Sequence, residues 1–173
     1  MSNRHLSIEL IGREHLRDGF DCGNAFLSRY LHRYARQNST KGLSRAYVVR
    51  EQADPTVLGY YTLSAGQIMF EESPPKLVRN LPRYPVPIAR IGELAIDKHH
   101  QGAGLGGILL MDAFRRVCDA SERIGILAIV VDAIDEKAEL FYGHFGFESF
   151  GDAGRHLYLP LQDASAWLRS DYA

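Results

Sequence analysis

The chain has 173 residues, 46% hydrophobic and 24% charged, with a formal net charge of −1. These values are typical of a globular protein with a buried core, so we expect a single domain over residues 1–173. No apolar run is long enough to cross a membrane, the first residues are not a secretory signal, and the only cysteines are Cys22 and Cys118, which predicts a cytoplasmic protein with reduced thiols.

The first half of the chain alternates between strand-like and helix-like patterns. In chain order we predict a strand over residues 6–10, a helix over 22–34, a polar break over 37–42, and paired strands over 46–50 and 57–65. The helix prediction rests on apolar residues at helical spacing with arginines on the opposite face.

The second half opens with a segment that is poor in regular structure. Five prolines between residues 71 and 87 exclude a long helix, so we predict a loop with at most a short helix near 76–80. The following predicted elements are a strand over 88–96, a helix over 108–120, a strand over 124–131, a helix over 136–144 and a closing strand over 155–159. This order predicts one α/β domain with a mixed sheet.

The near-neutral net charge conceals a strong asymmetry. Residues 1–92 carry 13 Lys/Arg and 8 Asp/Glu, whereas residues 93–173 carry 7 and 13. The stretches 28–50 and 76–90 contain basic residues and no acid, a pattern that fits polyanion binding and a solvated helix face equally well. The candidate polyanion-binding residues are Arg29, Arg33, Arg36, Lys41, Arg79, Arg83 and Arg90.

Metal-binding patterns are missing from the sequence. There is no CxxC pair, and no cluster of histidines has the spacing of metal ligands. The adjacent His99 and His100 fit a solvent-facing turn better, because neighbouring residues rarely converge on one ion. We therefore predict no metal.

A glycine-rich run, Gln101-Gly102-Ala103-Gly104-Leu105-Gly106, lies between the predicted strand over 88–96 and the predicted helix over 108–120. A turn at the start of a helix offers free backbone N–H groups and a positive dipole end, which bind phosphate or pyrophosphate. Glycine allows positive φ and close approach of a ligand. No Lys-Ser/Thr pair follows the glycines, and the spacing is not that of a dinucleotide fold, so both familiar phosphate motifs are excluded. On its own, the run is equally consistent with a helix-capping turn.

A second motif follows about 35 residues later, as Ala138-Glu139-Leu140-Phe141-Tyr142-Gly143-His144-Phe145-Gly146-Phe147. The two motifs, in this order and spacing, resemble those of the GNAT superfamily of acetyl-CoA-dependent N-acetyltransferases. Further segments, Phe20-Asp21-Cys22-Gly23, Leu58-Gly59-Tyr60-Tyr61-Thr62-Leu63 and Gly92-Glu93-Leu94-Ala95-Ile96-Asp97, are similar to the GNAT toxins of bacterial toxin–antitoxin modules. The resemblance runs from about Ile8 to Leu161.

The resemblance implies a GNAT fold, in which helices flank a mixed, mostly antiparallel sheet with splayed middle strands. It implies acetyl-CoA as cofactor, with its pyrophosphate on the amides of the glycine-rich run and its pantetheine arm along the preceding strand, where a backbone N–H would polarise the thioester carbonyl. Asp135 stands where many relatives have an asparagine that contacts this arm. The implied cofactor-binding residues are Leu94, Ala95, Ile96, Gln101, Gly102, Ala103, Gly104, Leu105, Gly106, Asp135 and Phe141.

Two residues are candidates for catalysis. Tyr142 matches the tyrosine of the family's Phe-Tyr pair, and a phenol stays protonated at neutral pH, so the resemblance makes it the general acid for the departing thiolate. Without the resemblance, Tyr142 would be a core residue. Glu93 departs from the toxins, which typically have arginine there; it is either a general base or an ordinary strand carboxylate paired with Arg90 or another neighbour.

The resemblance predicts an enzyme that acetylates the α-amine of aminoacyl-tRNA and so inhibits translation. It also predicts a ribbon-helix-helix antitoxin as partner and a homodimer. The alternative acceptor is a small-molecule or protein amine, with Glu93 as possible base. A cofactor-binding module without catalysis fits less well, because both the glycine-rich run and Tyr142 are present.

Overall fold

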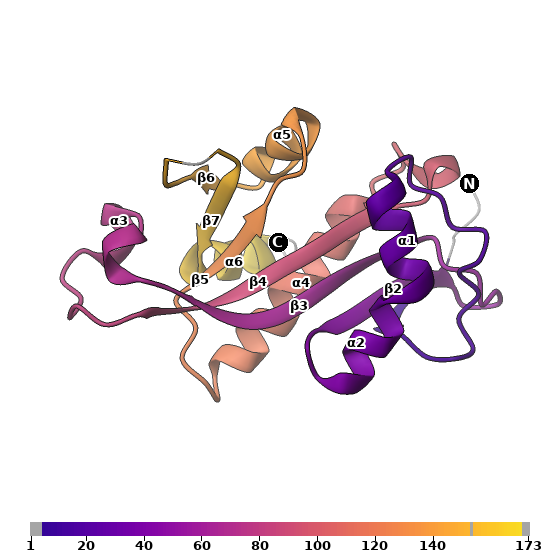
Figure 1. The fold of residues 1–173 in the computed structure, drawn as a ribbon, viewed down its shortest axis with the longest axis horizontal. Helices are drawn as coiled ribbons and strands as arrows, with labels where there is room; N and C mark the ends of the chain where they lie inside the picture. Colours follow the sequence, from indigo (N-terminus) through magenta and orange to yellow (C-terminus); the bar gives the residue numbers. More distant parts are fainter. Residues whose placement is uncertain (1–4, 153, 171–173) are drawn as a thin grey trace. The chain divides into compact units, whose positions relative to one another are not determined.

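The protein is described by a computed structural model for residues 5–152 and 154–170, with a seven-stranded sheet in the order β1-β2-β3-β4-β5-β7-β6 (Figure 1). The chain divides into two compact units. The first consists of the residues up to Ser64 and Gly92–Ala113, and the second of Ala65–Ile91 and the residues from Phe114 onward. Among the residues described, no helix is long and apolar enough to cross a membrane.

The first unit is built on antiparallel strands covered by two helices. Its elements are β1 (Leu6–Leu10), α1 (Ala25–Arg33), α2 (Ala35–Lys41), β2 (Arg45–Glu51), the first part of β3 (Gly59–Ile68), the last part of β4 (Val86–Ile96) and the start of α4 (Leu105–Ser121). β2 pairs antiparallel with both β1 and β3. Figure 1 shows α1 and α2 lying across β2.

Helix α1 begins where the sequence supplies a cap, because the Asn24 side chain accepts a hydrogen bond from the Leu27 amide. Its buried face carries Leu27 and Leu31, which join Tyr60 of β3 in the core of the first unit. Phe26 has the same helical spacing in the sequence but is 56% exposed. Burial of this one apolar stripe fixes α1 on the strands.

The second unit combines a parallel and an antiparallel strand pair. Its own elements are α3 (Pro75–Val78), β5 (Ala128–Asp132), α5 (Glu136–His144), β6 (Glu148–Ser149), β7 (His156–Pro160) and α6 (Leu161–Ser170). β5 pairs parallel with β4, from Ile88↔Ala128 to Ile91↔Val131, and antiparallel with β7. Branched side chains such as Ile88 and Val130 lie in its core, as expected for strands buried between layers.

Most predicted elements are present, although β5 begins at Ala128 rather than at 124 and α1 begins at Ala25 rather than at 22; one prediction is wrong and two elements were missed. The polar break over 37–42 is wrong, because α2 covers Ala35–Lys41 and ends at Gly42 in the left-handed conformation. This helix buries only Ala35 and Ser39, so it has no apolar periodicity to detect. Strand β6 and helix α6 were not predicted: β6 has two residues, and α6 follows β7 without a break.

Candidate functional site

The glycine-rich run has the conformation that its composition predicts. Gly102 and Gly104 have φ of 79° and 82°, and a Cβ on either would meet no atom within 4 Å. Both positions therefore need glycine for the backbone angle rather than for space. The turn is shorter than predicted, because α4 begins at Leu105, so Leu105 and Gly106 belong to its first turn. This first turn contains no acidic residue. The Ile108 amide of α4 donates to the Gly104 carbonyl at 3.2 Å, and the amides before it are those that a helix start leaves available to a ligand.

The side chain of Gln101 fixes the turn to the rest of the first unit. Its Nε2 donates to the carbonyl oxygen of Cys22 at 3.0 Å and to that of Ile96 at 2.9 Å. The carbonyl of Ile96, one of the backbone groups predicted to face the pantetheine arm, therefore already accepts a hydrogen bond from within the protein.

Hydrogen bonds and an ion pair among Asp21, Asp97 and Lys98 also hold the segment before the glycine-rich turn in place. The Asp97 side chain accepts from the amides of Asp21 and His99, each at 3.0 Å. Burial, the largest single effect, acts to raise the pKa of Asp97, but these hydrogen bonds together with the nearby histidines outweigh it and leave the pKa below the usual value. Lys98 forms an ion pair with Asp21 at 2.8 Å, and the hydrogen bond from Lys98 is the main reason that the pKa of Asp21 lies below its usual value. The Phe20-Asp21-Cys22-Gly23 motif thus buttresses the glycine-rich turn, a role that the sequence did not reveal.

Strand β3 fixes the first unit through three consecutive hydroxyl groups. Each donates a hydrogen bond of 2.6 Å to a different element: Tyr60 to the Leu27 carbonyl of α1, Tyr61 to Asp112 of α4 and Thr62 to Glu93 of β4. This explains the Tyr-Tyr-Thr part of the toxin-like segment. Thr62 was not predicted as a site residue, because no local pattern links it to Glu93.

Glu93 is bound by Thr62 in both directions. Its Oε2 accepts from the Thr62 hydroxyl, and its backbone N–H donates to Thr62 Oγ1 at 3.1 Å. Burial raises the pKa of Glu93, and the bond from Thr62 opposes that rise. Arg90, which the sequence analysis named as a possible ion-pair partner of Glu93, pairs instead with Asp132 at 3.0 Å. A carboxyl with a raised pKa is a better proton acceptor near neutral pH than an exposed one.

The end of β4 is in close contact with β3 at Gly59. A Cβ at Gly59 would lie 2.6 Å from Ile96 Cδ1 and 3.0 Å from the Ala95 carbonyl oxygen, so any larger residue would displace Ile96 and press on the Ala95 backbone. Ala95 is buried, and Leu94 and Ile96 are half-buried. The splay of the middle strands and the contact of these three residues with a pantetheine arm stay predictions.

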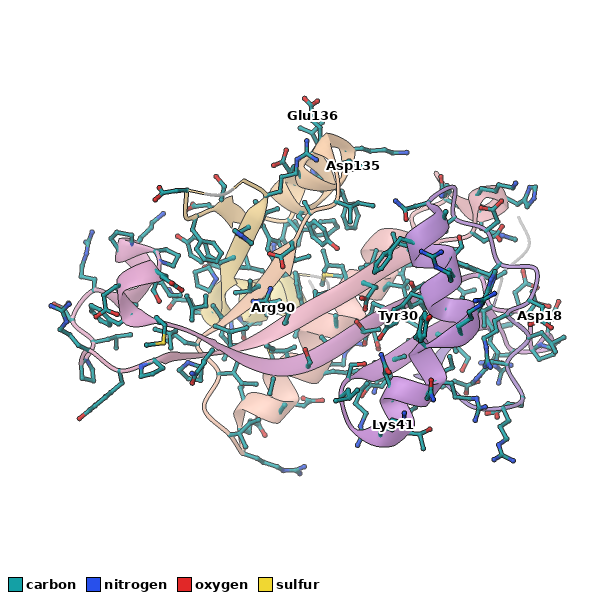
Figure 2. All side chains as sticks on the ribbon, in the orientation of Figure 1. Asp18, Tyr30, Lys41, Arg90, Asp135 and Glu136 are labelled. Atoms are coloured by element: carbon teal, nitrogen blue, oxygen red, sulfur yellow. The ribbon has the colours of Figure 1, made fainter. Side chains whose placement is uncertain are left out.

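Three of the predicted site residues lie on one short helix of the second unit. Asp135 is the N-cap of α5, since its side chain accepts from the Ala138 amide at 2.7 Å, and Figure 2 shows it at the helix start. Phe141 packs edge-on against Tyr142, with ring centroids 5.1 Å apart. Asp135 therefore has a structural role that the sequence interpretation did not include.

Tyr142 is 5% exposed, and burial raises the pKa of its phenol above the usual value, which keeps it protonated at neutral pH. Phe147 lies against its ring, and the neighbouring Phe145 packs on Trp167 of α6. The indole of Trp167 donates to the Phe145 carbonyl at 2.7 Å, so the unpredicted α6 closes the end of α5. The Tyr142 ring is thus held in a rigid aromatic cluster.

The predicted polyanion-binding residues differ in their surroundings. In the second unit, Arg83 pairs with Glu71 and lies over the Phe70 ring, and Arg90 pairs with Asp132. The acids come from outside the stretch 76–90, which is why a local charge count missed them. In the first unit, Arg29, Arg33 and Lys41 are exposed and Arg36 is half-buried; Figure 2 shows Lys41 at the end of α2.

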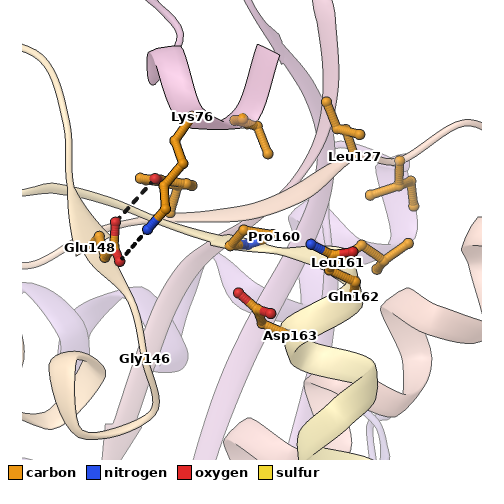
Figure 3. Close-up of a pocket in the computed structure, with 11 residues that line it drawn as sticks. Lys76, Leu127, Gly146, Glu148, Pro160, Leu161, Gln162 and Asp163 are labelled. Carbon is orange, nitrogen blue, oxygen red and sulfur yellow. Dashed lines mark hydrogen bonds and ion pairs between the residues drawn. The ribbon is translucent and has the colours of Figure 1, made fainter. Parts of the chain in front are cut away.

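A cavity of about 470 Å³ lies wholly in the second unit, beside α3, β7 and the start of α6 (Figure 3). Its charged lining is largely neutralised: Glu148 pairs with Lys76 at 3.3 Å and accepts from the Tyr158 hydroxyl at 3.2 Å. None of the predicted site residues lines it. Over the described residues there is also no group of three or more His, Cys, Asp or Glu that could hold a metal ion.

The chain was compared with known proteins. No protein-family model matches it. Over 149 residues it is 39% identical to the tRNA-acetylating toxin of Mycobacterium tuberculosis, covering 86% of this chain and 88% of the relative. The crystal structure of a Tyr-to-Phe mutant of KacT superposes on this chain with a TM-score of 0.88 at 30% identity, covering 94% of this chain and 99% of the KacT chain.

A structure of AtaT complexed with acetyl-methionyl-tRNAfMet has a TM-score of 0.86 at 29% identity, covering 94% of this chain and 98% of AtaT. Other structures hold AtaTR with acetyl-CoA and an AtaT mutant with the C-terminus of the antitoxin AtaR. Identity at this level over most of both chains, together with the glycine-rich turn and the α5 tyrosine, shows that the chain belongs to the GNAT family of tRNA-acetylating toxins.

Proposed function

We propose that this protein transfers the acetyl group of acetyl-CoA to the α-amine of aminoacyl-tRNA and so inhibits translation. The observation that carries the proposal is the turn at Gly102 and Gly104 before α4, a phosphate-binding arrangement, in a chain related to a tRNA-acetylating toxin. The AtaT structures with acetyl-CoA and with acetylated tRNA support the donor and the acceptor.

The residues of the first unit would bind the donor. The amides from Gln101 to Gly106 suit its pyrophosphate, since they combine positive-φ glycines with the start of a 17-residue helix that has no acid in its first turn. Backbone groups of Leu94 and Ala95 would hold the pantetheine arm, and an N–H there would polarise the thioester carbonyl. The described residues fit the chemistry that acetyl-CoA requires.

Tyr142 would act as the general acid. Its buried phenol keeps its proton at neutral pH and would donate it to the departing thiolate as the amine attacks. The Tyr-to-Phe mutants used for KacT and AtaT are consistent with a special tyrosine in this family. Because the α-amine of an esterified amino acid is less basic than a free amine, little general base is needed.

Partners and location follow from the same proposal. An antitoxin would cover the site, as AtaR binds AtaT, and we infer that it is of the ribbon-helix-helix type. A homodimer is proposed by the same resemblance. The substrate is found where translation takes place, so the reaction belongs to the cytoplasm.

One observation favours a second acceptor. Glu93 stands where the toxins typically have arginine, and its pKa is raised by burial, as suits a general base for a free amine. A small-molecule or protein amine is therefore the second candidate acceptor.

The test is transfer of radiolabelled acetate from acetyl-CoA to total charged tRNA, by the wild type and by Tyr142→Phe. We expect label in the tRNA fraction that mild ester hydrolysis releases, and a fall in kcat of about 100-fold or more in the variant with acetyl-CoA affinity retained. Phe147→Leu is the matched control for packing around the ring. Label in small amines or protein but not in tRNA would favour the second candidate.

A further inference from the structure

A strongly basic cavity lies in the first unit between the end of α1, α2 and the segment before α1. Its volume is about 290 Å³, and every side chain that lines it is polar: Arg17, His32, Arg33, Arg36, Gln37, Thr40 and Lys41. Four of these are permanent cations and none is an acid. We call this set the α1–α2 pocket. Of the residues predicted from the sequence to bind a polyanion it includes Arg33, Arg36 and Lys41, and it excludes Arg29.

The cations of the α1–α2 pocket lack the acidic partners that other cations of this protein have. Within residues 5–152 and 154–170, none of Arg17, Arg33, Arg36 and Lys41 is ion-paired, whereas Arg83 and Arg90 are. The Nε of Arg36 is buried and has no hydrogen-bond partner. A buried, unsatisfied guanidinium donor is costly unless an anion accepts from it.

Two of the lining residues are held in place. Arg17 Nε lies 3.4 Å from the carbonyl oxygen of His32, at the end of α1 where the helix dipole favours a cation. The Nε2 of His32 lies 2.8 Å from the Phe20 carbonyl oxygen, and since a carbonyl can only accept, Nε2 carries the hydrogen. The pocket is thus partly preformed, which lowers the entropic cost of binding a ligand.

The chemistry of the lining distinguishes between two kinds of polyanion. A protein partner needs apolar anchors at the centre of its interface, and the α1–α2 pocket offers none. Arginine forks match the oxygens of a phosphate in two-pronged contacts, and neutral Gln37 and Thr40 add further polar groups. We propose that the α1–α2 pocket binds a backbone phosphodiester of the tRNA substrate; this inference rests on the proposed function.

Hydrogen bonds link the α1–α2 pocket to the glycine-rich turn. His32 donates to Phe20, and two residues further along the chain the carbonyl of Cys22 accepts from Gln101. The segment Phe20–Cys22 therefore separates the two sites within the first unit. An RNA phosphate bound in the pocket would therefore be held at a fixed position relative to the turn that binds the acetyl donor. The pocket would in this way position the tRNA for the reaction.

The test is binding of uncharged total tRNA over a series of salt concentrations, followed by acetylation kinetics. The variant is Arg33→Gln/Lys41→Gln, because both side chains are exposed and their loss leaves the core unchanged. We expect tRNA to bind about tenfold more weakly, with the slope of log K against log salt reduced by about one to two, since one or two phosphate contacts are lost. KM for charged tRNA should rise while KM for acetyl-CoA stays constant.

The matched control is Arg123→Gln/Arg169→Gln, which removes the same charge from exposed positions outside the pocket. Equal loss of tRNA affinity in the control and the pocket variant would overturn the proposal, because net charge alone would then account for binding. Unchanged tRNA binding in the pocket variant, with weaker binding of poly-L-glutamate, would overturn it in favour of an acidic peptide. A different result would contradict the proposed function: in that case the wild type would bind tRNA but would not acetylate charged tRNA.

Discussion

At the scale of single residues, Gly92 and Thr62 determine the environment of the Glu93 carboxyl. A Cβ at Gly92 would lie 2.7 Å from Thr62 Oγ1, so glycine leaves room for the hydroxyl that bonds to Glu93. That hydroxyl favours the carboxylate form, whereas burial favours the neutral acid. The two effects act on the same carboxyl in opposite directions, and burial is the larger.

Replacing Thr62 by valine should therefore raise the pKa of Glu93 further, because burial then acts unopposed. The Glu93 amide also loses its acceptor, and we expect the free energy of unfolding to fall by about 1–3 kcal/mol. Thr62→Ser keeps both bonds and is the control. Carboxyl-carbon chemical shifts measured through a pH titration report the pKa directly. The same Glu93 titration in the valine and serine variants would contradict this account.

The same variants separate the two candidate acceptors. If Glu93 is a general base for a small amine, the acid limb of the pH profile of kcat/KM moves to higher pH in Thr62→Val. Acetylation of charged tRNA needs little base and should keep its profile. The departure from the toxins' typical arginine was visible in the sequence. The bond from Thr62 was not, because the two residues are 31 positions apart and meet only when β3 and β4 are in place.

At the scale of elements, the turn before α4 depends on backbone angles that only glycine adopts without strain. Gly104→Ala places a Cβ in open space but at φ of 82°, at a cost of about 1–2 kcal/mol. The turn should relax away from this conformation, and acetyl-CoA should bind about tenfold more weakly. Calorimetric titration with CoA measures this.

Gly151→Ala is the matched control for that prediction. Gly151 has φ of 76° and equally open surroundings, so an alanine there carries the same strain, and Gly151 is not among the predicted site residues. Both variants should lose a similar amount of stability, and only Gly104→Ala should lose affinity for CoA. Equal affinity in the two would show that the turn does not hold the cofactor.

Elements with a strong local signal were predictable from the sequence, and the others were not. Strand β4, helix α5 and the glycine-rich turn have apolar runs, caps or glycines that mark them. Helix α2 has seven mostly polar residues and is stabilised by its position on β2, a tertiary effect that overrides the local pattern. The fold class and most site residues came from the resemblance of motifs, whereas Asp97, Thr62 and Trp167 act through contacts distant in sequence.

At the scale of the whole molecule, charge is distributed by structure rather than by sequence stretch. The basic stretch 76–90 is largely neutralised by acids that the fold brings to it, while the cations of the α1–α2 pocket have no ion-pair partner among the described residues. A local count of charges cannot distinguish these cases, because pairing is decided by tertiary contacts. The single domain predicted over residues 1–173 stays a prediction beside the two compact units.

The pH dependence of stability should contain a strong contribution from β1. Glu9 accepts from Arg50 and from His15, whose Nδ1 in turn accepts from the Gly12 amide at 2.8 Å. The bond from Arg50, then that from His15, lowers the pKa of Glu9 to about 2 against an ordinary 4.5. Because the folded-state pKa is depressed, Glu9 adds stability that is fully present above about pH 4.5 and is lost as pH falls towards 2.

Glu9→Gln should therefore lower the urea midpoint at pH 7 and at pH 5, and the difference from the wild type should shrink steadily below pH 4.5. At pH 2 most of the difference between the two proteins should be gone, because the wild-type carboxyl is then protonated in the unfolded state and about half protonated in the folded state. Glu122→Gln, at an exposed position, controls for the loss of a negative charge. A difference that persists unchanged from pH 7 to pH 2 would mean that Glu9 stabilises the strand pair by packing rather than by its charge.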